Sequence, residues 1–186
     1  MSEKARPTRF LVVLAFAFAA ILALVGLSGC GPSAESEIES DIATQLDPIK
    51  NVDADTINSW LGDEADSLES VGLDSGEFYA SWFSGFDYKI DDIQVNDDTA
   101  TVAMTITVKQ LGTALDDAST ELTKNVESGD ITDVSQAGPV IIKAMDNTET
   151  TDSQITVNYY KNSDGKWTSS DITTEVTNAC IGDINY

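Results

Sequence analysis

An apolar run near the N-terminus divides this chain into two parts. Eighteen consecutive residues, from Phe10 to Leu27, carry no charged side chain. A run of this length is long enough to cross the hydrocarbon core of a bilayer. The cations Lys4, Arg6 and Arg9 precede it, which predicts that the N-terminus stays in the cytoplasm and that the following residues are exported. The rest of the chain is therefore expected to fold outside the cytoplasm.

The residues that end the run, Leu27-Ser28-Gly29-Cys30, resemble the lipobox of bacterial lipoproteins. Small Ser28 and Gly29 let the chain enter a peptidase site in extended form, and Cys30 supplies a thiol. The resemblance implies lipidation of Cys30, cleavage between Gly29 and Cys30, and anchoring at the extracytoplasmic face of the cell membrane, or at the outer membrane of an envelope that has one. The alternative is an uncleaved single-span anchor. Stop-transfer helices usually carry cations on their far side, whereas the first lysine here is Lys50.

This interpretation gives the chain three parts. Residues 1–29 are the expected signal peptide, residues 30–35 a lipidated tether, and residues 36–186 a single domain. Stable anchoring needs two or more acyl chains, because each buried methylene contributes only about 0.8 kcal/mol. At about 3.5 Å per residue, the tether keeps the domain within roughly 20 Å of the bilayer. We therefore expect a protein that works close to a membrane surface.

The chain that follows the apolar run is strongly acidic. From Cys30 onward it contains seven lysines, no arginine, no histidine and 31 acids, a net charge of −24. A surface of this charge repels phosphate backbones, and it lacks the guanidinium groups that bind phosphate through two parallel hydrogen bonds. Nucleic-acid binding is thereby excluded. The same charge attracts cations.

The first half of the expected domain has helical periodicity. A stripe of isoleucine and leucine predicts a helix over residues 36–47, which starts with a capping box at Ser36 and ends at Pro48. Two more helices are predicted over residues 55–71 and 75–84. A hydrophobic core is the favoured explanation for the aromatic residues of this region, and a ligand pocket with Tyr79 at its mouth is the alternative. These aromatic residues are Trp60, Phe78, Tyr79, Trp82, Phe83 and Phe86.

Strict alternation marks a half-buried antiparallel strand over Thr99–Lys109. The alternate residues of this strand are mostly threonines and end with Lys109, and they are predicted to face outward. The preceding strand, over residues 86–95, changes phase at Asp91 and Asp92, which indicates a β-bulge. The predicted inward residues of the alternating strand are Ala100, Val102, Met104, Ile106 and Val108.

Two helices, over residues 111–128 and 133–145, are predicted between this hairpin and a second one. The second hairpin joins strands over 153–161 and 166–172 through an Asn-Ser-Asp-Gly turn. A last short helix contains Cys180, which is expected to be a buried apolar residue without a disulfide partner. The predicted fold class is α+β, with N-terminal helices packed on a curved antiparallel sheet and a helical insertion between two hairpins.

Three segments of the sequence resemble segments of one known fold. They are Phe86-Asp87-Tyr88-Lys89-Ile90, Asp98-Thr99-Ala100-Thr101-Val102, and Tyr159-Tyr160-Lys161 leading to Asp164-Gly165-Lys166-Trp167. With the order of elements, they resemble the nuclear transport factor two-like (cystatin-like) α+β cone, and more narrowly the bacterial lipoproteins that carry such a domain. The helical segment Leu111–Met145 departs from the plainest version of that fold. Because the family includes enzymes, binding domains and assembly modules, the resemblance does not choose a function.

The chemistry-bearing residues are few. Without histidine there is no Ser-His-Asp or Cys-His arrangement, and one remaining thiol cannot form a zinc site. Asn51, Asp53 and Asp55 have the first spacings of a calcium loop. The required glycine and the final glutamate of that loop are replaced by Thr56 and Gly62. We therefore expect no metal site, no cofactor site and no catalytic residues.

Two principal function classes remain. The favoured one is a non-enzymatic, lipid-anchored extracytoplasmic domain that binds a small apolar ligand or an envelope protein. The alternative is an acid–base enzyme of the same cone fold, isomerase-like or cyclase-like, which would use an aspartate and a tyrosine. A purely structural assembly lipoprotein is a third, weaker option. We expect any cavity beneath the sheet to be apolar, without an Asp–Tyr pair within hydrogen-bond distance. Its expected lining is Trp60, Phe78, Trp82, Met104 and Tyr159.

Overall fold

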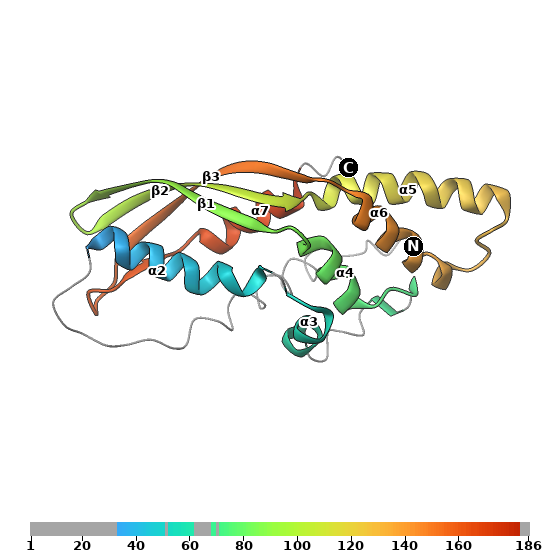
Figure 1. The fold of residues 1–186 in the computed structure, drawn as a ribbon, viewed down its shortest axis with the longest axis horizontal. Coiled ribbons are helices and arrows are strands. Elements are labelled where there is room, and N and C mark those ends of the chain that lie inside the picture. The colour runs from blue at the N-terminus through green and yellow to red at the C-terminus, as the bar shows by residue number, and fades with distance from the viewer. Residues whose placement is uncertain (1–32, 51, 62–67, 70, 183–186) are drawn as a thin grey trace, which may run out of the picture.

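A curved antiparallel sheet and the helices on one of its faces form the body of the protein (Figure 1). The computed structural model describes residues 33–50, 52–61, 68–69 and 71–182. In these residues the sheet has four strands in the order β1-β2-β3-β4, accompanied by six α-helices. The predicted α+β class, with helices before the sheet and a helical insertion between two hairpins, is confirmed.

Helix α2 (Ala34–Leu46) is the first element of the described chain. Its N-cap is Ser33, whose hydroxyl accepts a hydrogen bond from the Ser36 backbone N–H at 3.3 Å. The predicted capping box at Ser36 is therefore wrong, because an earlier serine satisfies the first free N–H groups. As predicted, Pro48 ends the helix, and it does so in the 3-10 turn η1 (Asp47–Ile49). The predicted stripe is buried throughout: Ile38, Ile42, Leu46 and Ile49.

Helices α3 (Ala54–Leu61) and α4 (Ser75–Phe83) follow. The single helix predicted over residues 55–71 is wrong as a continuous element, because Leu68 and Glu69 lie in a 3-10 turn. Helix α4 matches its prediction to within one residue at its end. Asp74 caps it, since its carboxylate accepts a hydrogen bond from the Glu77 N–H at 2.8 Å.

The first hairpin pairs β1 (Asp87–Asn96) with β2 (Thr99–Lys109). The register shifts between Ile90 and Asp92, so the predicted bulge is confirmed. The inward set of β2 is confirmed as well, since all five of its residues are at most 5% exposed. Residues of the opposite face, such as Thr101, are exposed to solvent.

The second hairpin pairs β3 (Thr150–Lys161) with the short β4 (Trp167–Ser169). Asn162 closes its turn, because its side-chain oxygen accepts hydrogen bonds from the Asp164 and Lys166 N–H groups. The strand predicted over 166–172 is too long, since helix α7 (Ile172–Ile181) already begins at its last residue.

Helices α2 and α7 cover the inner face of the sheet, on the same side of it (Figure 1). Helix α5 (Leu111–Ser128) continues from the end of β2 and leads away from the start of α2 (Figure 1). Helix α6 (Gly138–Asn147) returns antiparallel to it, after the 3-10 turn η3 (Val134–Gln136). The α5–α6 hairpin therefore projects from one end of the molecule, and α2 begins at the other.

The predicted aromatic cluster forms a core. Trp82 and Phe83 stack with ring centroids 5.2 Å apart, and Tyr79 stacks on both of them. Tyr79 is only 6% exposed, so its predicted place at a cavity mouth is wrong, and burial raises the pKa of its phenol to about 12. The side chain of Trp60 lies outside the described residues.

Substitutions on the two faces of β2 should differ sharply in their effect. Val102 is fully buried, so Val102→Asp places an unpaired charge in the core and should lower the free energy of unfolding by about 3–5 kcal/mol. Thr101→Asp on the exposed face should cost about 1 kcal/mol or less. Urea denaturation of the two variants measures the difference. Equal losses would contradict the register of the sheet.

Candidate functional site

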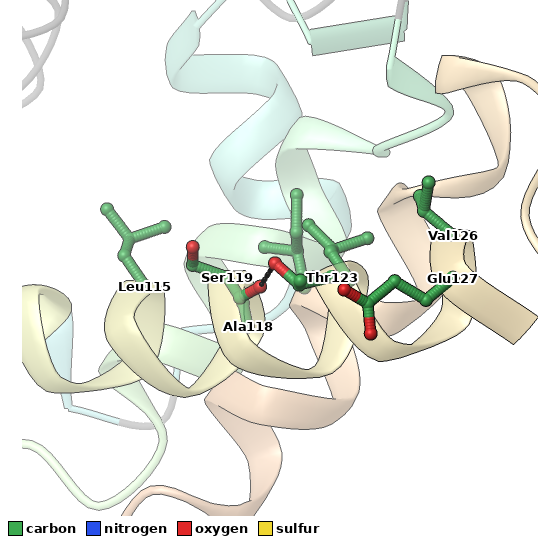
Figure 2. A pocket seen from close by; sticks show the side chains of 8 residues that line it. Leu115, Ala118, Ser119, Thr123, Val126 and Glu127 are labelled. Atoms are coloured by element: carbon green, nitrogen blue, oxygen red, sulfur yellow. Dashed lines mark hydrogen bonds between the residues drawn. The ribbon is translucent and has the colours of Figure 1, made fainter.

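An apolar groove runs along the projecting α5–α6 hairpin (Figure 2). Its volume is about 520 Å³. Two of its large apolar side chains are exposed to solvent, Leu115 by 39% and Val126 by 58%. Exposed apolar groups that lie together on a surface often mark a binding site. The residues that line the groove are Leu115, Ala118, Ser119, Leu122, Thr123, Val126, Glu127 and Ile141.

The spacing of apolar residues on α5 creates this groove. Five apolar residues keep helical spacing along this helix: Leu111, Leu115, Ala118, Leu122 and Val126. Leu111 and Ala118 are buried, whereas Leu115 and Val126 are not. The stripe is wider than the surface that α6 covers, so its outer half remains exposed as one wall of the groove.

A buried lysine attaches α6 to the sheet. The Lys109 ammonium group donates hydrogen bonds to the carbonyl oxygens of Met145 at 2.9 Å and Asp146 at 3.3 Å, in the last turn of α6. A cation at this position also interacts favourably with the helix dipole. Lys109 is 8% exposed, so its predicted place on the solvated face is wrong. The strand alternation ends at Val108, because Val108 and Lys109 are both buried and Lys109 lies against the last turn of α6.

Two neighbouring groups complete this attachment. Trp82 on α4 donates its indole N–H to the Lys109 carbonyl at 2.8 Å. Ser81 donates its hydroxyl to the Asp146 carboxylate at 2.6 Å. A serine, an aspartate and a lysine thus lie close together without forming a nucleophilic site, because their protons are used to join α4, β2 and α6.

Close backbone contact fixes the other end of α6. A Cβ atom on Gly138 would lie 1.8 Å from the Gly72 carbonyl oxygen, and a Cβ on Gly72 would lie 1.8 Å from the Ser135 carbonyl oxygen. Only glycine permits this approach. With Lys109 at its last turn and Gly138 at its first, α6 is held as a fixed wall of the groove.

An aspartate and a tyrosine do lie within hydrogen-bond distance, contrary to expectation. The Tyr159 hydroxyl donates to the Asp41 Oδ2 atom at 2.9 Å, and the Gln45 side-chain amide donates to the same atom at 2.7 Å. Burial raises the pKa of Asp41, and these two hydrogen bonds oppose the rise. Burial, followed by the nearby Asp41 charge, raises the pKa of Tyr159.

This pair has the geometry of a structural link between α2 and β3. Tyr159 is 2% exposed and belongs to the main core. A substrate would have to displace core side chains to reach its hydroxyl group. Phe78, Trp82 and Met104, which were expected to line a cavity with it, are packed in the same core.

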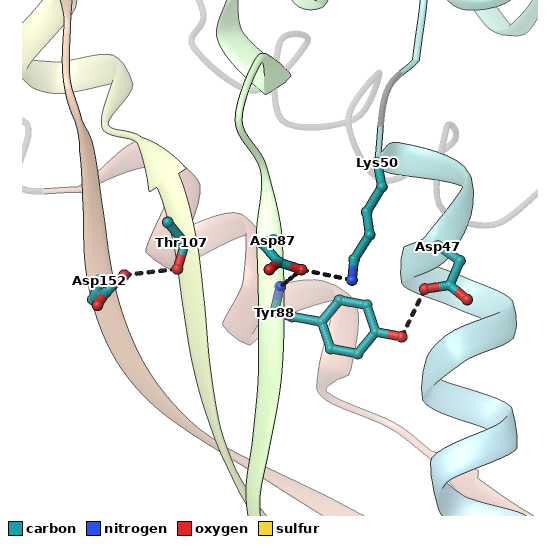
Figure 3. Close-up of polar contacts among 6 residues, drawn as sticks. All are labelled: Asp47, Lys50, Asp87, Tyr88, Thr107 and Asp152. Atoms are coloured by element: carbon teal, nitrogen blue, oxygen red, sulfur yellow. Dashed lines mark hydrogen bonds and ion pairs between the residues drawn. The ribbon is translucent and has the colours of Figure 1, made fainter.

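A second tyrosine joins η1 to β1 (Figure 3). The Tyr88 hydroxyl donates to Asp47 at 2.8 Å, and the Lys50 ammonium group lies 4.3 Å from the centroid of the Tyr88 ring. Lys50 also pairs with Asp87 at 2.6 Å, and this hydrogen bond lowers the pKa of Asp87. The cluster lies on the surface, where such ion pairs contribute little to stability.

The remaining chemical candidates have structural roles. Asp53, the middle residue of the calcium-like spacing, caps α3 by accepting a hydrogen bond from the Thr56 N–H at 2.7 Å. Asn51 lies outside the described residues, and within them no cluster of three acids or thiols suits a metal ion. Cys180 is fully buried, and burial raises its pKa to about 12. Cys30 and Gly29, the predicted lipidation and cleavage residues, also lie outside the described part of the chain.

Comparison with known proteins adds little to this description. No protein-family model and no curated protein matches the chain. One solved structure, of a candidate lipoprotein (ycdA) from Bacillus subtilis subsp. subtilis str. 168, aligns with 100% of the chain at 13% identity and a TM-score of 0.43. The chain covers 62% of that protein. A likeness of this size shows neither a family nor a function. None of the helices in the described ranges is long and apolar enough to cross a membrane.

The raised pKa of Asp41 predicts a pH-dependent cost to folding. Ionised Asp41 destabilises the folded state above its folded pKa, and this cost disappears as the pH falls toward the unfolded value of about 3.9. Asp41→Asn removes the cost, so its melting temperature relative to the parent should rise as the pH increases through this window.

Thermal melts at a series of pH values measure this difference. Asp164→Asn, on an exposed turn, removes the same charge and is the matched control. If the difference between the Asp41→Asn variant and the parent shrank as the pH increased, the pKa of Asp41 would be lowered in the folded state instead.

Proposed function

We propose that this protein is a lipid-anchored extracytoplasmic domain that binds a protein partner through the groove of the α5–α6 hairpin. The observation that carries the binding part is the groove itself, in which Leu115 and Val126 are exposed on rigid elements. Binding sites are typically apolar hollows with a few polar groups at their edges. Here Ser119, Thr123 and Glu127 supply those groups.

The anchoring part rests on the sequence. The charge-free run ends at a small-small-cysteine motif, and an acidic chain without a nearby cation follows it. We infer that residues 1–29 are removed, that Cys30 carries the lipid, and that the residues from Cys30 to the start of α2 at Ala34 form the tether of a single domain. The resemblance to lipoproteins with a nuclear transport factor two-like cone belongs to this proposal.

The arrangement of the elements suits a tethered binding domain. The lipid would be attached four residues before Ala34, where α2 begins, and the α5–α6 hairpin lies at the opposite end of the molecule (Figure 1). Strand β2 has 11 residues and α5 has 18. Laid end to end they reach up to roughly 60 Å. The groove would therefore be presented far from the point of attachment.

The Asp41–Tyr159 pair is the observation that favours an acid–base enzyme. A general acid or base must lie within reach of its substrate and have a pKa close to the working pH. Tyr159 is buried in the core, and its pKa moves away from that range. The structural role of the pair accounts for its contacts, so the binding function is the better supported proposal.

Metabolic labelling tests the anchor. Cells given radioactive palmitate should label the parent protein, whereas the Cys30→Ala variant should take up no label and stay at the size of the precursor. The physical reason is that only the Cys30 thiol is placed to accept the lipid after export. Cys180→Ala is the matched control and should be labelled like the parent, because its thiol is buried. Equal labelling of the Cys30→Ala variant would contradict lipidation.

Photo-crosslinking in cells tests the groove. A photoreactive residue at Ser119, inside the groove, should give a defined protein adduct. The photoreactive residue placed instead at Thr156, on the exposed outer face of the sheet, should give no such adduct. Adding Leu115→Ser and Val126→Ser should abolish the Ser119 adduct. An adduct that survives these substitutions would show that the groove does not bind the partner.

A further inference from the structure

We infer that the partner segment held in the groove is a cationic amphipathic helix of another protein. This inference rests on the proposed binding function and adds the chemistry of the partner. It follows from three features of the α5–α6 hairpin: the length of the apolar strip, the carboxylates along its open edge, and the directions of its lysines.

The apolar strip has the dimensions of a helix-binding groove. Leu115, Leu122 and Val126 are seven and four residues apart, so they lie on one side of α5 over about three turns, or roughly 16 Å. Ile141 on α6 forms the facing wall. A groove between two helices accepts the apolar face of a third, whose side chains at positions i, i+4 and i+7 enter it. The strip matches about three turns of such a helix.

Carboxylates follow the open edge of this strip. Asp116 and Glu127 are eleven residues apart, three helical turns, and therefore lie on the same side of α5, next to Thr123. Glu127 is one of the residues that line the groove (Figure 2). Both residues are exposed, and within the described residues neither of them forms an ion pair.

The lysines of the hairpin are directed away from the groove. Lys124 is nine residues after Leu115, half a helical turn away from it, and it pairs with Glu121 at 3.3 Å. Lys143 is two residues after Ile141, so it projects from the far side of α6. In the part of the chain that the structure describes, the groove thus has apolar walls and a negative edge without a compensating cation. A helix with lysine or arginine beside its apolar face is complementary to both.

The same charges disfavour two other occupants. A second copy of this chain would bring another hairpin with seven acids and two lysines into contact with the first. A bilayer with anionic lipids would repel the acidic edge. Complementary charge therefore selects a basic protein segment over self-association and over the membrane surface.

Peptide binding to the full-length chain tests the inference. The protein is placed in phosphatidylcholine nanodiscs, and binding to empty nanodiscs is subtracted. The probe is a fluorescent helical peptide of about 18 residues built from leucine and lysine, long enough to span the strip. Two further peptides replace every lysine by glutamine or by glutamate. Fluorescence anisotropy measures the dissociation constant at low and at high salt.

Paired variants distinguish binding at the groove from nonspecific attraction between the peptide and the acidic protein. Leu115→Ser with Val126→Ser keeps the charge and should weaken binding of the lysine peptide by about tenfold or more. Asp116→Asn with Glu127→Gln should weaken it by about three- to tenfold and reduce its salt dependence. Asp97→Asn with Asp164→Asn removes the same two charges at the other end of the molecule, where both residues are exposed. This pair should change binding less than twofold.

Each outcome decides between the two proposals. Groove-dependent binding that is strong for the lysine peptide, weaker for the glutamine peptide and absent for the glutamate peptide supports a cationic partner. Groove-dependent binding of equal strength for the lysine and glutamine peptides overturns the cationic partner but leaves the groove as the binding site. Equal losses in the Asp116/Glu127 and Asp97/Asp164 pairs also overturn the cationic partner. Binding that ignores the Leu115 and Val126 substitutions overturns the proposed function itself.

Discussion

The buried ammonium group of Lys109 connects the two halves of this molecule. It lies at the last residue of β2, where the sheet ends and the α5–α6 hairpin begins, and it donates to carbonyl groups in the last turn of α6. A buried lysine is costly unless its protons find acceptors. The helix end supplies those acceptors: the Asp146 carbonyl, and the Met145 carbonyl, which also accepts a hydrogen bond from the Thr148 N–H. The sheet and the hairpin therefore satisfy each other's polar groups, and the groove depends on this contact for its rigid wall.

The sheet gains its stability in a different way. The five inward residues of β2 lie between β1 and β3 and share one core with the buried residues of α2 and α7. A register shift of one residue would move all of them to the solvent face, so the hydrophobic pattern excludes such a shift. The Asp41–Tyr159 hydrogen bond then adds a polar link between α2 and the same face. The partly buried Asp41 carboxylate lowers stability above its folded pKa, which indicates that the link specifies a position more than it strengthens the fold.

The fold could be predicted from sequence wherever a local pattern decides the structure. The alternation of β2, the phase change that marks the bulge, and the glycine that ends α5 are local signals, and the structure confirms them. The start of α2 was wrong because Ser33, and not the equally suitable Ser36, is the N-cap. The continuous helix over 55–71 was wrong because Leu68 and Glu69 lie in a 3-10 turn. Lys109 could not be placed, because its burial depends on α6, which is 29 residues later in the chain. Burial by a distant element has no signature in the strand itself.

The groove, like the burial of Lys109, depends on the position of α6 and has no signature in the α5 sequence alone. The apolar stripe of α5 reads as an ordinary core-facing surface, and only the three-dimensional position of α6 shows that half of it stays exposed. The chain has a formal net charge of −22, and like charges keep copies apart in spite of the exposed valine and leucine. The acidity of the protein therefore makes an open apolar groove tolerable. It leaves complementary, positively charged surfaces as the ones that can approach it.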